Sequence, residues 1–166
     1  VFGETLAARG IDRETRERAR GFLRRPGVSV LPDARAATAA ARVHAMHDPT
    51  EGGLATGLME LALAARVGLR IERDAILVLP ECAACCRVLG LDPLGLIASG
   101  ALLLTCDPSE ADGVLAAWWA QGIEGSVIGA VTPPEAGTRL VGQNGEESLP
   151  RFARDEVARL FDAQSV

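Results

Sequence analysis

The chain has 166 residues, 48% of them hydrophobic, and carries a formal net charge of -5 at pH 7. A chain of this length can bury about two-thirds of its unfolded surface, so the composition fits one compact domain. The acidic balance argues against a surface for nucleic acid, and the longest apolar runs are far shorter than the roughly 20 residues that cross a membrane.

Two polar segments come first in the chain. Val1–Arg9 is expected to form a short strand or linker. Asp12–Arg25 is expected to form a helix with six arginines and three acidic residues, and we expect this excess of positive charge to face water. The chain does not begin with Met, and its start lacks the long apolar run of a signal peptide. We therefore interpret it as a piece of a longer protein, with a first boundary at Pro26-Gly27.

Predicted helices and strands alternate in the middle of the chain. Asp33 is expected to cap an Ala-rich helix that ends near Val43. After a loop at residues 48–53, apolar residues recur at helical spacing, and Gly68 is expected to end that helix. Val67–Glu72 and Ala75–Leu79 are predicted strands.

A second group of elements follows from Pro and Gly positions. Pro80–Leu89 is a predicted helix that Gly90 ends, and Leu91–Ile97 is an irregular or helical bridge. Ala101–Cys106 is a predicted buried strand. Asp107–Gln121 is a predicted helix with a near capping box at its start.

The last part of the chain predicts strands, a hairpin and a helix. Ile123–Val131 is strand-like, and Thr138–Val141 can pair with Glu147–Leu149 across the turn Asn144-Gly145. Arg151–Ala163 is a predicted terminal helix, with its apolar residues Phe152, Val157, Leu160 and Phe161 toward the core. This order indicates an α+β fold, a layered sandwich with a mixed β-sheet covered by helices.

The stretch Asp48-Pro49-Thr50-Glu51-Gly52-Gly53 is the most informative about chemistry. Its two glycines let the backbone approach a ligand where a helix begins, and the unpaired N–H groups there can receive a phosphate. Asp48 could hold a metal-bound water or fix the loop, Thr50 could donate its hydroxyl to an oxygen, and His47 could donate to an anion. The chain has no lysine or tyrosine, so N–H groups, hydroxyls, arginine or a metal ion would have to hold the phosphate.

A purely structural interpretation of the same stretch is also open. Asp48 or Thr50 can cap the helix, while Gly52-Gly53 permits a tight turn against a neighbouring strand. The residue types alone do not decide between the two interpretations.

Three stretches together resemble one superfamily. His44–Ala55 looks like the Asp-Pro-Thr-x-Gly-Gly-Leu-Ala loop of hydrogenase-maturation HypE-like proteins. Leu89–Leu94, followed by Ala98-Ser99-Gly100 and an apolar strand, resembles their Leu-Gly-Leu-Asp-Pro-Leu segment and small-residue turn. Pro26–Val30 is similar to the synthetase-related branch. The resemblance, over about residues 26–149, is to the carboxy-terminal domain of the PurM-like superfamily, which includes aminoimidazole-ribonucleotide synthetase and HypE.

This resemblance implies a carboxy-terminal synthetase-like domain at residues 28–166, preceded at residues 1–27 by a linker or remnant of a missing amino-terminal domain. In the superfamily that domain supplies most ATP and Mg²⁺ ligands and the dimer interface, and the cleft between the domains takes the phosphates and the substrate. The implied cofactors are ATP and Mg²⁺. The implied partners are the chain's own amino-terminal domain, a second copy in a homodimer, and a small-molecule or peptide-tail substrate.

By the same analogy, the phosphate- or substrate-binding residues would face the interdomain cleft, and they are Asp48, Thr50, Gly52 and Gly53, with His47, Ser99 and Gly100 close to them. The implied reaction is ATP-driven activation of an amide-type oxygen by phosphoryl transfer, in which positioning and electrostatics dominate. No catalytic residue is assigned, and this domain alone is expected to be inactive.

Two departures from HypE point to a related protein with an undefined substrate. HypE ends in a Cys that is carbamoylated and dehydrated to a cyano group, whereas this chain ends in Gln164-Ser165-Val166. HypE also tends to carry Arg where this chain has Glu51. The alternative function is a non-catalytic binding or assembly module with the same fold.

The cysteines have a structural interpretation. Cys82, Cys85 and Cys86 lack a second pair at zinc-finger spacing and are expected to be small thiols on a core-facing helix, one of them semi-exposed and oxidisable. The four cysteines of the chain lack the spacing of a disulfide framework, which favours a reducing cytoplasm.

Two further pairs are best explained without a ligand. His44 and His47 would share a metal ion only if a helix continued that far, so no metal site is predicted. Trp118 and Trp119 should diverge by about 100 degrees, one toward the core and the other toward a domain or dimer interface.

Overall fold

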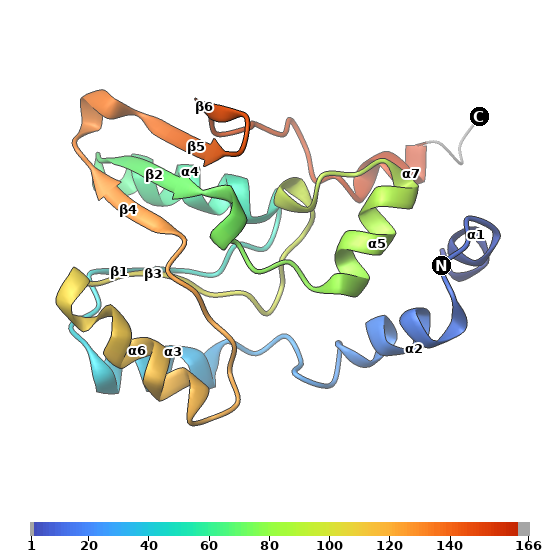
Figure 1. The fold of residues 1–166 in the computed structure, drawn as a ribbon, viewed down its shortest axis with the longest axis horizontal. Coiled ribbons are helices and arrows are strands. Elements are labelled where there is room, and N and C mark those ends of the chain that lie inside the picture. The colour runs from blue at the N-terminus through green and yellow to red at the C-terminus, as the bar shows by residue number, and fades with distance from the viewer. Residues whose placement is uncertain (1, 163–166) are drawn as a thin grey trace.

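The computed structural model describes residues 2–162 (Figure 1). In chain order its helices are α1 (Gly3–Ala8), α2 (Arg13–Gly21), α3 (Leu31–Ala40), α4 (Gly53–Ala65), α5 (Pro80–Leu89), α6 (Ala111–Trp119) and α7 (Ala158–Asp162). Its strands are β1 (Ala45–His47), β2 (Gly68–Glu72), β3 (Leu103–Thr105), β4 (Gly129–Thr132), β5 (Thr138–Gly142) and β6 (Gly145–Ser148). Short 3-10 turns are η1 (Arg73–Ala75), η2 (Pro93–Gly95), η3 (Pro108–Glu110) and η4 (Pro134–Ala136).

The strands form two groups. Four of them make a mixed sheet in the order β4-β2-β5-β6, in which β2 runs parallel to β5 and antiparallel to β4. Strands β1 and β3 form a separate antiparallel pair. The predicted α+β class with a mixed sheet is therefore confirmed.

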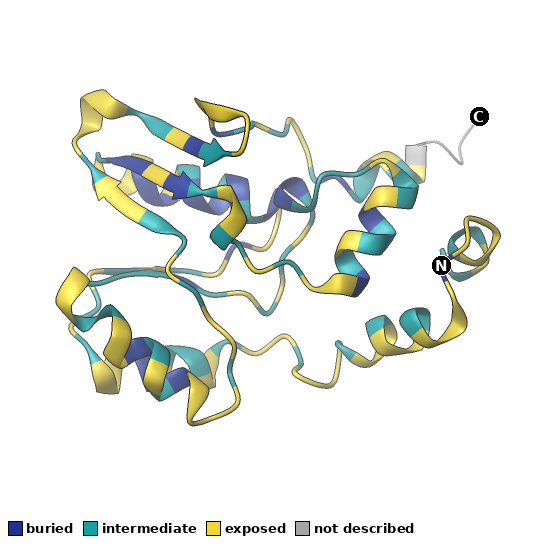
Figure 2. Ribbon diagram, in the orientation of Figure 1, coloured by how far each residue is buried: buried dark blue, intermediate teal, exposed yellow. Residues whose placement is uncertain are grey.

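Two apolar cores lie on different sides of the β1–β3 pair. The larger joins α4 to the four-stranded sheet and includes Leu58, Ile71 and the fully buried Leu140. The smaller joins α3 to α6 around Ala37 and Trp118. Figure 2 shows the buried colour on α4, on β2 and β5, and on the pair α3 and α6, and Figure 1 shows α1, α2 and α5 together at the other end of the molecule.

Several predicted elements are confirmed. Helix α5 begins at Pro80, and Gly90 follows it in the left-handed conformation with φ 69°. Strands β5 and β6 pair antiparallel across the Asn144-Gly145 turn. The predicted divergence of the two tryptophans is also observed, because Trp118 is 8% exposed and Trp119 is 83% exposed.

Other predictions in the first half of the chain are wrong. The segment at Val1–Arg9 contains helix α1, which packs on α2 and α5. Helix α3 begins at Leu31, because Pro32 suits its first turn, so Asp33 lies inside the helix. Arg66 in the left-handed conformation ends α4, whereas Gly68 starts β2, where a Cβ would lie 2.6 Å from the Pro133 carbonyl oxygen.

Three predicted strands or helices are absent or shorter than expected. Ala75–Leu79 is not a strand, because Ala75 ends η1 and residues 76–79 are irregular, with Leu77 exposed. Of the strand-like stretch Ile123–Val131, only the end lies in the sheet, where β4 spans Gly129–Thr132. The predicted terminal helix is confined to Ala158–Asp162 within the described residues, because the Glu156 N–H before it donates to the Gly95 carbonyl oxygen of η2.

Within residues 2–162, no helix has the length and apolar character needed to span a membrane.

Candidate functional site

The motif that begins at Asp48 forms a bend between β1 and α4. The Thr50 N–H donates to the Asp48 carbonyl oxygen over 2.9 Å, which closes the turn. Asp48, Thr50 and Glu51 are exposed, whereas Pro49 is fully buried. The side chains of the motif that could meet a ligand are therefore on its outer rim.

The two glycines of the bend are buried, and both have left-handed backbones, with φ 72° at Gly52 and 66° at Gly53. A Cβ on Gly53 would lie 2.5 Å from the Leu96 carbonyl oxygen and 2.7 Å from that of Leu94. Gly53 is thus explained by close packing against the chain's own η2 segment. The residue that caps α4 is Gly52, and no side chain of the bend caps the helix, so the alternative in which Asp48 or Thr50 caps it is not observed.

A carboxylate from the end of the chain binds at the start of α4. The Gly52 N–H donates to Oδ2 of Asp155 over 3.1 Å, and the Val157 N–H donates to Oδ1 over 2.9 Å. The N-terminus of α4 therefore already holds an oxyanion, and that oxyanion belongs to the same chain. Sequence reasoning missed Asp155, because 103 residues separate it from Gly52.

The next residue, Glu156, holds the second motif. Its Oε2 accepts the Asp92 N–H over 2.9 Å and the Arg159 guanidinium over 2.7 Å, and its own N–H donates to the Gly95 carbonyl oxygen. Burial raises the pKa of Glu156, but the bonds from Arg159 and Asp92 outweigh it and hold that pKa below the usual 4.5. Adjacent tail carboxylates thus join the bend to the Leu-Gly-Leu-Asp-Pro-Leu segment.

The turn that contains Ser99 and Gly100 lies beside the bend, as expected from the resemblance. The Ala98 N–H donates to the Thr50 carbonyl oxygen over 3.2 Å. Ser99 is exposed, and a Cβ on Gly100 would lie 2.8 Å from the Gly27 carbonyl oxygen. Ser99 is therefore the residue of this turn whose side chain is accessible.

His47 makes a contact that the sequence did not predict. Its Nε2 lies 2.7 Å from Oε2 of Glu60, the only charged residue of α4. An ionised carboxylate accepts hydrogen bonds only, so Nε2 is the donor in this pairing. The sequence signal that could have identified Glu60 is that it is the single charged residue of the helix that became α4.

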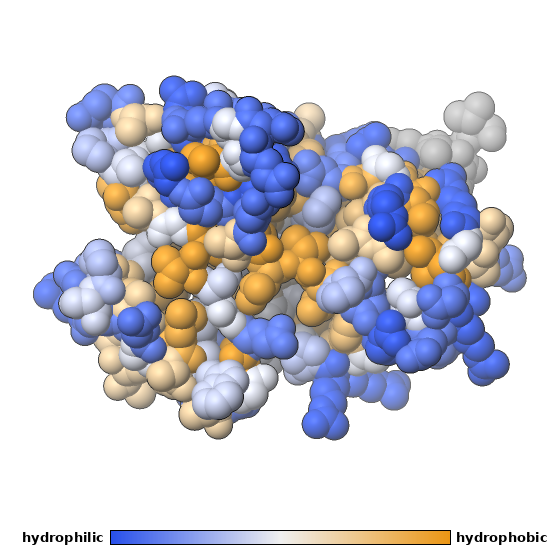
Figure 3. Space-filling view, in the orientation of Figure 1, coloured by the Kyte–Doolittle hydropathy of each residue, from blue (hydrophilic) through white to orange (hydrophobic). Residues whose placement is uncertain are grey.

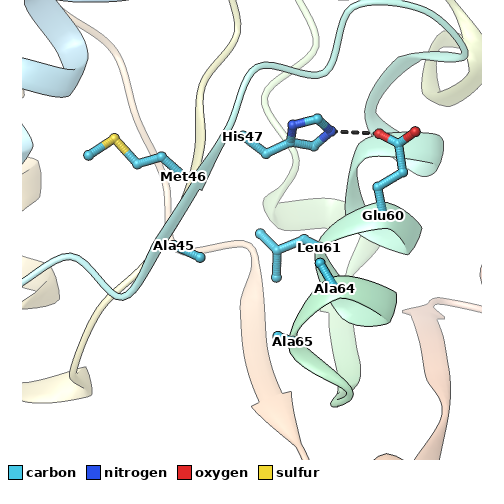
Figure 4. Close-up of a pocket in the computed structure, with 7 residues that line it drawn as sticks. All are labelled: Ala45, Met46, His47, Glu60, Leu61, Ala64 and Ala65. Carbon is cyan, nitrogen blue, oxygen red and sulfur yellow. Dashed lines mark hydrogen bonds and ion pairs between the residues drawn. The ribbon is translucent and has the colours of Figure 1, made fainter.

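The His47–Glu60 pair lies at a cavity of about 410 Å³ between β1 and α4. Figure 4 shows the imidazole turned toward Glu60, with Leu61 below the pair and Met46 directed away from it. The rest of the lining is aliphatic, from residues Ala45, Ala64 and Ala65. His44 does not join this pair, because β1 is extended and the helical spacing that a shared metal would need is absent.

The rim of the bend is acidic. Asp48 and Glu51 are exposed, and the carboxylate of Asp155 lies at the start of the helix. Among residues 2–162, no three or more His, Cys, Asp and Glu side chains are grouped so that they could hold a metal ion. The rim of these described residues is therefore not a closed metal site, and a metal ion there would need further ligands from elsewhere.

The fold and the two motif loops define the class of this domain. The chain belongs to the family described as AIR synthase related protein, C-terminal domain, whose model matches residues 3–142. The predicted PurM-like membership is thereby confirmed.

The chain is also similar to individual HypE proteins. It is 41% identical over 128 residues to the carbamoyl dehydratase HypE of Rhizobium leguminosarum bv. viciae, which covers 70% of this chain and 37% of that protein. The crystal structure of Escherichia coli HypE matches with a TM-score of 0.70 and 29% identity, over 79% of this chain and 42% of that one. A structure of HypE in complex with ATP matches with a TM-score of 0.62 and 28% identity, over 68% of this chain and 37% of that one. The chain thus spans well under half the length of these relatives.

The packing at Gly53 predicts a large effect of a small substitution. Gly53→Ala should lower the free energy of unfolding by about 3 kcal/mol, because alanine is strained in a left-handed conformation and its methyl group would overlap two carbonyl oxygens. Urea denaturation measures this loss. The matched control is Gly90→Ala, where φ is 69° and nothing lies within 4 Å of the added Cβ, so only about 1 kcal/mol should be lost. Equal losses in the two variants would contradict the contact at Gly53.

The lowered pKa of Glu156 predicts a pH dependence of stability. Because the folded state holds the carboxylate ionised, its contribution is complete above the usual pKa of 4.5 and is lost as the pH falls through the lower folded value. Glu156→Gln should therefore destabilise the protein near neutral pH, and the difference from wild type should shrink in acid. Urea titrations at several pH values measure this, with the exposed Glu135→Gln as control. A difference that stays constant with pH would refute the role of the ionised carboxylate.

Proposed function

We propose that this chain is the carboxy-terminal part of an ATP-dependent enzyme related to HypE, and that its bend at residues 48–53 faces a cleft completed by an amino-terminal domain. The exposed polar side chains at this position are Asp48, Thr50, Glu51 and Ser99, and His47 lies beside them. In this proposal residues 1–27 are a linker to the amino-terminal domain or a remnant of it, and their helices α1 and α2 pack on α5. The reaction class is phosphoryl transfer to an amide-type oxygen of a small molecule or peptide tail, in the cytoplasm.

One observation carries the proposal: the N-terminus of α4 binds a carboxylate, Asp155, through the Gly52 N–H. A carboxylate and a phosphate oxygen are both oxyanions that suit the positive end of a helix. The bend therefore has the chemistry to bind a phosphate oxygen. Because Asp155 occupies the N–H of Gly52, a phosphate would have to displace the tail from that position.

The acidic rim makes Mg²⁺-bound nucleotide a better ligand than free triphosphate. Asp48 and Glu51 would repel an uncompensated phosphate, whereas Mg²⁺ neutralises part of that charge. When bound, Mg²⁺ would supply positive charge that offsets the negative charge developing on the phosphate during transfer. We assign most of its ligands to the amino-terminal domain, since this rim is not a closed metal site.

An apolar face supports docking of that domain. Figure 3 shows hydrophobic side chains gathered on one face, where the segment between η1 and α5 and the segment before β4 run. Leu77, Leu79 and Val127 are exposed large apolar residues of these segments. Such clustering on a protein surface is typical of a face that another domain covers. The relatives are much longer than this chain, and a corresponding additional part of the present protein would supply that domain.

The Asp155 contact also favours the alternative function, a non-catalytic binding or assembly module. If the tail stays on Gly52, the bend remains closed to phosphate. The module would retain the fold and its docking face but would not turn over ATP.

Thermal denaturation with Mg-ATP tests the proposal. The chain joined to its amino-terminal domain should be stabilised by the nucleotide, by about 2.7 kcal/mol at a concentration 100 times Kd, whereas the present chain alone should not. Asp48→Ala should abolish or strongly reduce the stabilisation. The exposed Asp112→Ala on α6 should retain it.

Phosphate release in the same samples separates the two functions. Release that depends on Asp48 supports the enzyme, and nucleotide binding without release supports the module. Wild-type binding and turnover in Asp48→Ala would show that the site is assigned to the wrong residues.

A further inference from the structure

Helix α5, away from the bend, carries a pair of facing thiols. The sulfur atoms of Cys82 and Cys86 lie 3.9 Å apart, one helical turn from each other. Cys86 is 2% exposed, whereas Cys82 is partly exposed. A buried thiol therefore faces a thiol of a partly exposed residue.

This contact makes the two thiols chemically different. The hydrogen bond from Cys86 lowers the pKa of Cys82 to about 7, although burial opposes this shift. The same contact raises the pKa of Cys86, so the proton stays on the buried sulfur. Cys82 also lies in the first turn of α5, where helix N–H groups favour an anion.

The charged groups around the pair come from four segments. Glu81 precedes Cys82 on α5, but Arg18 of α2 binds its carboxylate over 2.7 Å. Arg9, which follows α1, donates to the Val88 carbonyl oxygen of α5. The negative charge of Asp92, in the loop after α5, helps to raise the pKa of Cys86. No cation in this group contacts the Cys82 sulfur, among the interactions of the described residues, so Cys86 is the partner that favours the thiolate.

Helix geometry limits what this pair can form. Residues four apart on a helix have Cβ atoms about 5–6 Å apart, whereas a disulfide needs about 3.5–4.5 Å. A Cys82–Cys86 disulfide would therefore require α5 to unwind. An adduct on Cys82 should persist, because Cys86 cannot displace it within the intact helix.

We propose that Cys82 is a thiol-modification site that captures a small-molecule disulfide as a mixed disulfide, with Cys86 as the positioning residue that keeps it ionised. The Cys82 thiolate attacks one sulfur of the incoming disulfide, whose S–S bond breaks. A new S–S bond forms at Cys82, and the other half leaves as a thiolate. This proposal does not depend on the proposed function.

Alkylation and disulfide exchange on the intact chain test the site. One thiol should react rapidly with iodoacetamide near pH 7, and its rate should rise with pH around a midpoint of about 7. Oxidised glutathione should add once per chain, as measured by mass spectrometry. Cys82→Ala should remove both reactions, whereas Cys85→Ala and Cys106→Ala should retain them.

Variants at Cys86 test the hydrogen bond. Cys86→Ala should move the midpoint of the alkylation rate toward the ordinary cysteine pKa of about 8.5. The reaction at pH 7 should slow by about three-fold or more, because less of Cys82 is ionised, although its thiolate becomes more nucleophilic as its pKa rises. Cys86→Ser keeps a donor and should stay near the wild-type midpoint, and circular dichroism checks both folds. A wild-type midpoint near 8.5, fast labelling in Cys82→Ala, or loss of two thiols without added mass would each overturn the proposal.

Discussion

The architecture around the bend depends on one close approach of backbone to backbone. Gly53 lies against the carbonyl oxygens of Leu94 and Leu96, at a separation that no Cβ could occupy. This contact brings the start of α4 to the η2 segment, and the Ala98 N–H then reaches the Thr50 carbonyl oxygen. Two motifs that are about 40 residues apart in the sequence are thereby held as one surface.

The tail secures that surface with two adjacent carboxylates. Asp155 binds the Gly52 N–H and Glu156 binds the Asp92 N–H, so each motif receives one of them. Phe152 adds an apolar cover, since a Cβ on Gly95 would lie 2.6 Å from its ring. The same residues that stabilise the loops also occupy the helix N-terminus that we propose for phosphate. Gly53 therefore serves packing, as the structural interpretation holds, and the Gly52 N–H binds a carboxylate of the same chain. Phosphate binding at the bend stays a prediction.

Local signals in the sequence predicted much of the fold. Pro80 and Gly90 mark the ends of α5, and Asn144-Gly145 marks the β5–β6 turn, because these residues restrict the backbone by themselves. The bend was also expected at the start of a helix. Family resemblance, rather than composition, predicted that the turn at Ser99 lies close to it.

Long-range partners could not be predicted in the same way. Asp155 and Gly52 are 103 residues apart, and neither residue carries a local pattern that names the other. The apolar spacing of the tail predicted a longer helix, but the Asp155 and Glu156 carboxylates and the Glu156 N–H bond to other loops, which confines the helix to α7 within the described residues. The His47–Glu60 contact could not be predicted for the same reason, since it depends on how β1 packs on α4. Tertiary contacts decided these cases against local propensity.

The central claim is that Asp155 and a phosphate compete for the same end of α4, and nucleotide affinity of the Asp155→Asn variant tests it most directly. The measurement is a calorimetric titration with Mg-ATP of the chain joined to its amino-terminal domain. Removal of the competing charge should tighten binding by about three-fold or more, since hydrogen bonds to charged groups contribute about 1.5–3 kcal/mol and exposure reduces that amount. Unchanged or weaker binding, in a variant that keeps its fold, would show that the helix start is a structural cap and not a phosphate site.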